Sequence, residues 1–365
     1  MTTNPLPLSV LDLATVSEGS SSRTALLDTT TLARRADALG YRRFWVAEHH
    51  AMPAVASTAP AVLIAHLAGV THHLRIGSGG VMLPNHPSLV VAEQFAMLEA
   101  LHPGRIDLGI GRAPGADPMT AAALRRTVEG LGAEDFPAEL IDVLALLGQT
   151  PPGRAPSARA RRLSATPVQG STPQVWLLGS SLFSATLAGE LGLAFSYANH
   201  FATGRTEQAA DAYRAAFRPS EVLAEPHLMV SASVLLAETE AEAHHLAGPS
   251  RVMALSLRGG GRLGPIVSPD DAERVLAGLD PDTARAFFAQ SPGTQLATTP
   301  ERAVAALGDL AARTGADELL VTGTSHDVGT RVRTLELLAE AWGLTAPDAP
   351  GTAEPAGLAG QASRG

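Results

Sequence analysis

Short apolar runs alternate along the chain with longer segments in which apolar residues recur at helical spacing. Runs of this length that are rich in β-branched and aromatic residues predict buried strands, and the periodic segments predict amphipathic helices. The predicted strands cover residues 6–13, 43–47, 74–83, 106–111, 174–179, 194–198, 227–236 and 318–323. The predicted helices cover residues 24–39, 58–70, 89–101, 184–191, 205–218, 241–259, 300–314 and 328–342.

Strict alternation of strands and helices predicts a parallel sheet, because each crossover helix returns the chain to the edge from which it started. Eight such pairs match a (β/α)8 TIM barrel of the α/β class. The competing architecture is a doubly wound open sheet, which would carry a glycine-rich dinucleotide turn after its first strand. Residues 13–19 read LATVSEG and lack that turn, so the barrel is favoured.

Two connections are longer than a minimal barrel needs. Residues 112–173 separate the fourth and fifth predicted strands, and residues 260–298 separate the seventh and eighth, with extra helices expected at 270–279 and 281–289. Both insertions leave the carboxyl ends of strands, where barrel active sites and their lids lie. We expect one barrel domain over residues 1–344 and a disordered tail over 345–365, which is rich in Ala, Gly and Pro.

Composition narrows the class of protein. The 365 residues carry a formal net charge of −9, which argues against nucleic acid or an anionic membrane as the main partner. The chain has no cysteine, so disulfides and thiolate metal sites are excluded. Neither a signal peptide nor an apolar stretch long enough to cross a membrane is recognisable, and we expect a cytoplasmic protein.

Titratable side chains follow the second predicted strand as Glu48-His49-His50. A histidine at a barrel mouth can accept or donate a proton near neutral pH, so His49 or His50 is a candidate acid or base. Adjacent residues point to different sides, and we expect at most one of the two histidines to act in chemistry while the other is structural. A zinc site made of Glu48, His49 and His50 is the alternative, although neighbouring residues rarely converge on one ion.

Glycines interrupt the third predicted strand at Gly77, Gly79 and Gly80. Glycine weakens a buried strand and therefore needs a reason. The functional reason would be close approach of a flat ligand to the backbone, and the structural alternative is tight packing of neighbouring elements.

Two anion-binding signals follow the fourth and fifth predicted strands. Arg112 ends the fourth strand, where its guanidinium could hold a phosphate, or instead pair with a loop carboxylate such as Asp117. Ser180 and Ser181 form a turn between the fifth strand and a helix, where backbone N–H groups favour an anion. The plainer interpretation of the serines is helix capping. Because the two strands are neighbours in a barrel, one phosphate pocket is predicted.

The order of these motifs resembles the bacterial luciferase-like flavin-dependent monooxygenase family over about residues 6–343. The residues that carry the resemblance are Glu48-His49-His50, residues 77–84 with His86 and Pro87, Ala92-Glu93-Gln94, Gly104 and Arg105 with residues 109–112, residues 176–181, and residues 315–321.

The resemblance implies a barrel that holds FMN against the third strand, with reduced flavin supplied by a separate flavin reductase, reaction with O2 to a C4a-hydroperoxide, and attack on an organic substrate. By position, His49 matches the catalytic histidine, and Gly79-Gly80 match a non-proline cis peptide beside the flavin. Arg112 and Ser180 match phosphate ligands, and Ser181 is expected to assist them.

This chain also departs from the family pattern. Gly111 stands where luciferases have a reactive cysteine, and Gly179 stands where they have an acidic residue. Light emission is therefore not expected. More room over the flavin is expected, because a glycine replaces the larger cysteine.

The resemblance thus implies a two-component FMN-dependent monooxygenase, a homodimer that oxygenates an organic small molecule in bacterial secondary metabolism such as antibiotic biosynthesis. The alternatives are an F420-dependent oxidoreductase and a non-catalytic flavin-binding protein on the same barrel.

Overall fold

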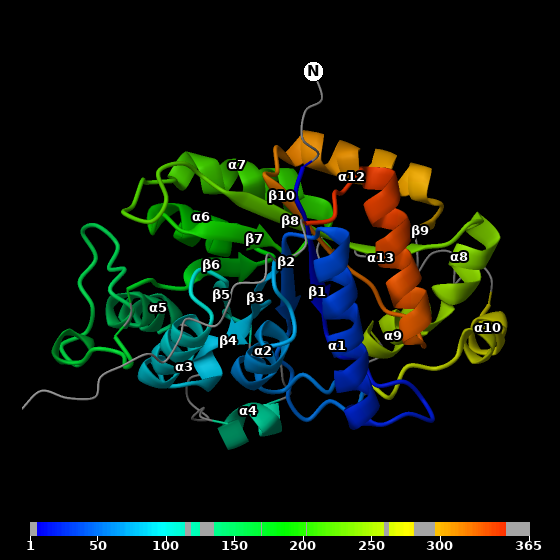
Figure 1. The fold of residues 1–365 in the computed structure, drawn as a ribbon, viewed down its shortest axis with the longest axis horizontal. Helices are drawn as coiled ribbons and strands as arrows, with labels where there is room; N and C mark the ends of the chain where they lie inside the picture. The colour runs from blue at the N-terminus through cyan, green and yellow to red at the C-terminus, as the bar shows by residue number, and fades with distance from the viewer. Residues whose placement is uncertain are drawn as a thin grey trace, which may run out of the picture.

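Eight parallel strands close into a barrel in the computed structural model, which describes residues 6–113, 118–124, 135–168, 170–201, 203–258, 263–280 and 296–347. Helices surround the strands (Figure 1). The predicted (β/α)8 barrel is therefore confirmed. In order around the barrel the strands are β1 (Leu8–Asp12), β2 (Arg43–Val46), β3 (Arg75–Ser78), β5 (Ile106–Gly111), β6 (Gln174–Gly179), β7 (Ala194–Tyr197), β8 (Leu228–Leu236) and β10 (Glu318–Thr322), with β10 pairing β1 and β8.

Each crossover carries at least one helix. The helices are α1 (Ser22–Leu39), α2 (Pro60–Ala68), α3 (Ser88–Leu101), α4 (Pro118–Leu124), α5 (Phe136–Leu146), α6 (Leu182–Glu190), α7 (Thr206–Ala216), α8 (Glu240–Leu246), α9 (Gly248–Arg258), α10 (Pro269–Ala277), α12 (Pro300–Thr314) and α13 (Val328–Trp342). Short 3-10 turns lie at η1 (Leu83–Asn85), η2 (Ala160–Arg162) and η3 (Thr203–Arg205). Among the described helices, none combines the length and the apolar character that spanning a membrane would require.

Three details differ from the prediction. The single strand expected at 74–83 is two pieces, β3 and β4 (Val81–Met82), which flank Gly79 and Gly80 and both pair with β5. The helix expected at 241–259 is α8 and α9, because Pro249 lacks the backbone N–H that would continue a helix. The connection from β8 to β10 also contains a short strand, β9 (Leu296–Thr298), that pairs with the end of β8. The helix expected at 281–289 and the tail beyond residue 347 lie outside the described residues.

Alternating side chains along the strands build two separate apolar cores. Outward-facing residues such as Val10, Phe44, Ile76 and Leu177 pack under the helices in the largest hydrophobic cluster. Inward-facing residues fill the middle of the barrel, where the indoles of Trp45 and Trp176 meet edge to face with 5.3 Å between ring centroids. A period of two along each strand explains both sets. The interior cluster consists of Leu11, Trp45, Ala47, Trp176, Ala194, Met229 and Leu320.

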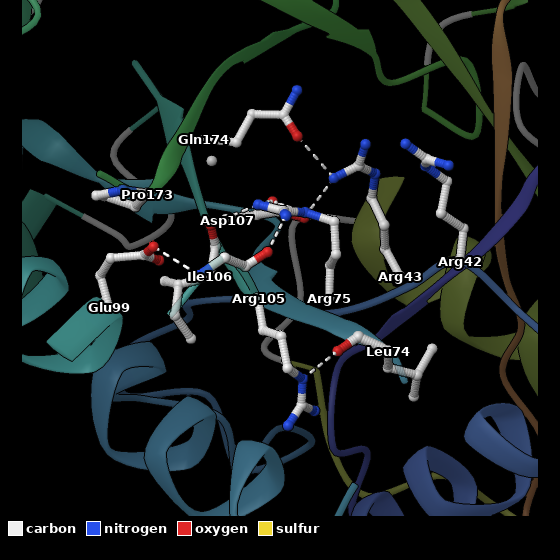
Figure 2. A network of polar contacts seen from close by, with 12 residues as sticks. Arg42, Arg43, Leu74, Arg75, Glu99, Arg105, Ile106, Asp107, Pro173 and Gln174 are labelled. Atoms are coloured by element: carbon white, nitrogen blue, oxygen red, sulfur yellow. Dashed lines mark hydrogen bonds and ion pairs between the residues drawn. The ribbon is translucent and has the colours of Figure 1, made fainter. Parts of the chain in front are cut away.

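A buried ionic layer closes the amino-terminal end of the barrel. Arg43 donates to Asp107 at 2.8 Å and to Glu318 at 2.9 Å, and its side chain is only 1% exposed. Arg75 also donates to Asp107, and Gln174 accepts from Arg43 (Figure 2). The guanidinium of Arg43 stacks on Trp176, 4.8 Å from the ring centroid. The ionic layer, the tryptophan layer and the open carboxyl end therefore follow one another along the barrel axis.

Candidate active site

A cavity of about 270 Å³ lies at the carboxyl ends of the strands, on the far side of the tryptophan layer from the ionic network. Its wall includes every residue that the sequence singles out for cofactor binding or catalysis. These are His49 after β2, Gly79 and Gly80 between β3 and β4, Arg112 after β5, and Ser180 and Ser181 after β6. The structure thus brings together, from four consecutive positions around the barrel, residues up to 132 positions apart in the chain (181 − 49).

His49 lies on the cavity wall with an unused ring nitrogen. Its backbone N–H donates to Ser57 O at 3.1 Å, which fixes the turn after β2. Its Nδ1 is buried and has no hydrogen-bond partner among the described residues. Burial lowers the pKa of His49 below its ordinary value of 6.5, and the neighbouring Glu48 carboxylate offsets part of that effect. The imidazole is therefore neutral at pH 7 and can accept a proton.

His50 and His86 both donate through Nε2 to the same carboxylate oxygen of Glu48, each at 2.7 Å. The other oxygen of Glu48 accepts from the backbone N–H of Met82 at 3.0 Å. Burial acts to raise the pKa of Glu48, but His86, His50 and the Met82 N–H outweigh it, and the net pKa lies below its ordinary value. The Glu48 carboxylate therefore links the end of β2 to β4 through its hydrogen bond with Met82.

The zinc alternative is not the arrangement that the structure shows. His49 faces the cavity, whereas the ring nitrogens nearest to Glu48 belong to His50 and His86. Adjacent histidines point to opposite sides of an extended turn, which is why the two cannot share one ion with Glu48. His49 thus lines the cavity, while His50 is held by its hydrogen bond to Glu48.

Gly79 and Gly80 form a flat part of the cavity wall, and the peptide bond between them is cis, which confirms that prediction. A Cβ atom on Gly79 would lie 2.6 Å from Leu11 Cδ1, and one on Gly80 would lie 2.7 Å from the carbonyl oxygen of Gly109. Gly77 lies deeper, where a Cβ would lie 2.6 Å from Asp107. Packing alone explains the glycine at position 77. At positions 79 and 80, both the packing against neighbours and the open cavity wall require a residue without a side chain.

Arg112 stands at the cavity edge with its guanidinium over the ring of Phe183, 4.7 Å from the centroid. Stacking on an aromatic face orients a guanidinium while leaving its N–H groups available in the ring plane. Asp117, the carboxylate considered as its partner, lies outside the described residues. Arg112 is therefore held at the cavity edge by its contact with Phe183.

The turn after β6 combines capping with an exposed N-terminus. Ser181 is the N-cap of α6 and accepts from the backbone N–H of Ser184 at 3.3 Å. Gly179 allows this tight turn, because a Cβ there would lie 2.4 Å from the Ser184 side chain. An acidic residue at position 179 would therefore displace the helix start. The capping function is confirmed, and the exposed Ser180 hydroxyl stays available to an anion.

Gly111 widens the cavity beside Gly80. A Cβ at this position would approach the carbonyl oxygen of Val81 at 4.0 Å and meet nothing closer. The expected extra room at the end of β5 is thus present.

His200 and Ser231 line the same cavity, the first after β7 and the second within β8. The sequence offered His200 only as a possible metal ligand and did not single out Ser231. His200 and Ser231 are 31 positions apart and meet only because β7 and β8 are neighbours. The position of His200 directly after a predicted strand was the one signal that could have identified it.

The barrel and the cavity define a protein that binds a small molecule at the carboxyl ends of eight parallel strands, with a cation, a helix N-terminus and a neutral histidine around it. The sequence model of the luciferase-like monooxygenase family matches residues 6–340. The chain belongs to the luciferase-like monooxygenase family. A flavin-dependent monooxygenase was the expected class of enzyme, and the family membership confirms it.

Curated relatives match most of the chain. A luciferase-like monooxygenase of Escherichia coli strain K12 is 40% identical over 349 residues, which are 92% of this chain and 97% of the relative. The N-acetyl-S-alkylcysteine monooxygenase of Bacillus subtilis strain 168 is 37% identical over 271 residues, which are 74% of this chain and 79% of the relative.

Solved structures share the whole architecture. The crystal structure of apo-MsnO8 has a TM-score of 0.84 at 37% identity and covers 94% of this chain and 100% of its own. The oxygenating constituent of 3,6-diketocamphane monooxygenase from Pseudomonas putida, solved in complex with FMN, has a TM-score of 0.68 at 20% identity and covers 94% and 100%. At that identity the second likeness shows the fold alone.

Proposed function

We propose that this protein is a two-component monooxygenase that takes reduced FMN from a separate flavin reductase and uses O2 to oxygenate an organic small molecule. The observation that carries the proposal is the single cavity in which a neutral histidine, a side-chain-free wall, a stacked arginine and a serine turn meet. Each of these features is complementary to a different part of a phosphorylated flavin. The described residues around the cavity contain no carboxylate that would repel its phosphate.

The residues present fit FMN in three places. Arg112, Ser180 and Ser181 would hold the phosphate with a guanidinium, a hydroxyl and the N-terminus of α6. Gly79 and Gly80 would face the flat ring system, since they line the cavity and carry no side chain. The imidazole of His49, which lines the cavity, would accept or return a proton beside the ring. Reduced FMN bound there supplies the electrons that activate O2.

The apolar part of the wall serves the same chemistry. Leu11, Met82, Leu178 and Leu320 line the cavity and keep water from its inner end. The B. subtilis relative is named for N-acetyl-S-alkylcysteines, so thioethers of that kind belong in the first substrate panel. We also propose, from the family alone, that the protein acts in the bacterial cytoplasm and takes part in secondary metabolism.

Anaerobic titration followed by mixing with O2 tests the proposal. The protein is titrated with photoreduced FMN and, separately, with reduced F420, and then oxygen consumption and product are measured with the substrate panel. We expect binding of reduced FMN and oxygen-dependent product formation. Binding of F420 alone with hydride transfer and no oxygen consumption would contradict it. Tight FMN binding without turnover of any panel member would instead favour a non-catalytic flavin-binding protein.

Replacing Arg112 by methionine is expected to weaken FMN binding about 10- to 100-fold, because a charge-assisted hydrogen bond to an ion contributes roughly 1.5–3 kcal/mol. Riboflavin lacks the phosphate, so its affinity should change less than threefold. Fluorescence titration of both flavins measures the two constants. Equal losses for FMN and riboflavin would contradict the phosphate assignment, and a thermal melt of the variant checks that it is folded.

The proposal includes a homodimer that forms through α2 and α3. The two helices pack side by side, and they expose Val62 to 72%, Met97 to 56% and Leu101 to 63%. Val90 extends the stripe on α3 at a spacing of seven and four residues. Large apolar side chains that gather on one face are typical of an interface between subunits.

Replacing Met97 by glutamate is expected to shift the protein from dimer to monomer at micromolar concentration, because a buried charge without a partner opposes association. Sedimentation velocity measures the change. Replacing Val275 by glutamate is the matched control, since Val275 is 47% exposed on α10, away from the proposed interface. A wild-type protein that sediments as a monomer would contradict the dimer.

A further inference from the structure

His200 is the one titratable residue of the cavity, within the described residues, that the flavin assignment leaves without a function. It follows β7, between the serine turn at the end of β6 and Ser231 on β8. The cavity wall thus carries two histidines, on well-separated strands, and a role for His49 does not explain the other.

Hydrogen bonding fixes which nitrogen of His200 carries the proton. Nδ1 lies 2.5 Å from Ser231 Oγ, and Ser231 Oγ lies 3.1 Å from the carbonyl oxygen of Tyr197. The Ser231 hydroxyl is placed to donate to Tyr197 O, which also accepts from the backbone N–H of Asn199 at 2.9 Å. With its hydrogen on Tyr197 O, Ser231 Oγ accepts from Nδ1–H of His200, and the backbone N–H of His200 also donates to it at 3.4 Å.

The remaining nitrogen, Nε2, is consequently an acceptor with a free lone pair. No hydrogen bond to Nε2 occurs among the described residues, and the ring to which it belongs lines the cavity. Burial lowers the pKa of His200 to about 4, so the ring stays neutral at pH 7. The other titratable side chains on the described wall are His49 and Arg112. At neutral pH, His200 therefore presents neither a cation nor a base of ordinary strength, but a fixed hydrogen-bond acceptor.

A flavin has the donors that such an acceptor requires. Its ring carries an N–H group in every redox state and further N–H groups when reduced, and its ribityl chain carries hydroxyls. The cavity that would hold the flavin is the one that His200 lines, at the end of β7 and beside the serine turn that follows β6. A flavin bound there would lie in the same cavity as the free Nε2 of His200.

We propose that His200 is a flavin-binding residue whose Nε2 accepts a hydrogen bond from a ring N–H or a ribityl hydroxyl, and that Ser231 positions it by fixing the tautomer. This inference rests on the proposed function, because it takes flavin as the occupant of the cavity. It separates His200 from Arg112 by the part of the cofactor that each recognises: Arg112 binds the phosphate, and His200 binds the part that FMN and riboflavin share.

Titration of FMN and riboflavin against His200→Phe, His200→Gln and wild type tests the inference. Phenylalanine keeps a ring and removes the acceptor, so we expect both flavins to bind about tenfold more weakly, by the same factor. Glutamine restores an acceptor oxygen and should recover most of the affinity. His73→Phe is the matched control, because His73 is exposed and lies outside the cavity wall.

Ser231→Ala and the redox state of the flavin sharpen the result. Without the Ser231 hydroxyl, Nδ1–H loses its partner and the second tautomer becomes accessible, so Ser231→Ala should weaken binding of both flavins by a smaller factor. A loss confined to the reduced flavins assigns the contact to an N–H that only reduction creates, and a loss in both redox states assigns it to N3–H or the ribityl chain.

Wild-type affinity of His200→Phe for FMN and riboflavin in both redox states would overturn the inference and leave the proposed function intact. Absence of flavin binding by the wild-type protein would instead overturn the proposed function itself. A thermal melt of each variant distinguishes lost contacts from lost folding.

Discussion

Replacing Arg43 by methionine is expected to lower the free energy of unfolding by about 3–5 kcal/mol, which is the cost of removing one partner from a buried ion pair. Arg43 is 1% exposed and neutralises Asp107 and Glu318, whose side chains are fully buried. Methionine keeps much of the side-chain volume, so the loss reports the uncompensated carboxylates rather than a cavity. Urea denaturation at pH 7, followed by circular dichroism, measures the change.

Arg42 provides the matched control for this experiment. It is the neighbouring residue (Figure 2). It lies 3.6 Å from the same carboxylate of Glu318, but its side chain is 51% exposed. Exposed ion pairs contribute about 0–1 kcal/mol, so Arg42→Met should change the stability little. If Arg42→Met and Arg43→Met destabilise the protein equally, burial of the network is not what makes Arg43 important.

The pH dependence of stability should identify Glu318 as one of the uncompensated groups. Burial acts to raise the pKa of Glu318, but His227, Arg43 and the Ser9 hydroxyl outweigh it, so its folded pKa lies below 4.5. A carboxyl with a lowered folded pKa stabilises the protein above its unfolded pKa and loses this contribution as the pH falls through the folded value. In Arg43→Met the carboxylate costs most when ionised and its folded pKa rises, so the stability gap to wild type should narrow as the pH falls from the raised folded pKa of the variant to the lowered folded pKa of wild type.

The barrel could be predicted because its cause is local. Apolar runs and helical periodicity can be recognised in the linear sequence. Strands β5 and β6 begin and end at the predicted residues. The break between β3 and β4 was not predicted, because it depends on how Gly79 and Gly80 pack against Leu11 and Gly109 on other strands. The ionic layer was missed for the same reason: Arg43, Asp107 and Glu318 are far apart in sequence and meet only when the barrel closes.

The site could be predicted as a place but not as a set of contacts. Residues that follow parallel strands must gather at one end of a barrel, so the grouping of His49, Arg112 and Ser180 in one cavity follows from the topology. Which side chains touch is decided by rotamers and neighbours. The pairing of Glu48 with His86 and the pairing of His200 with Ser231 therefore had no signature in the linear order.

Replacing His49 by alanine is expected to lower the rate of substrate oxygenation about 10²- to 10⁴-fold at saturating reduced FMN, the range that a positioned general base or acid contributes. His49 suits this function because its imidazole lines the cavity and burial lowers its pKa below 6.5. Flavin affinity should change only a few-fold, because the phosphate is held on the opposite side of the cavity wall. Single-turnover product formation, started by mixing the variant bound to reduced FMN with O2 and substrate, measures the rate.

The pH profile decides whether His49 acts as a proton acceptor or only fills space. Its pKa lies below 6.5, chiefly through burial, and the neutral form is the one that accepts a proton. Wild-type activity should therefore be constant around pH 7 and fall below pH 6.5 as the imidazole becomes protonated, whereas His49→Ala should lack this acid limb. Added imidazole should restore part of the activity of the variant. An acid limb that persists in His49→Ala, or a variant that reacts at the wild-type rate, would assign the proton transfer to another group. His200 is a poor substitute in this pH range, because its pKa is about 4 and its Nδ1 proton is held by Ser231.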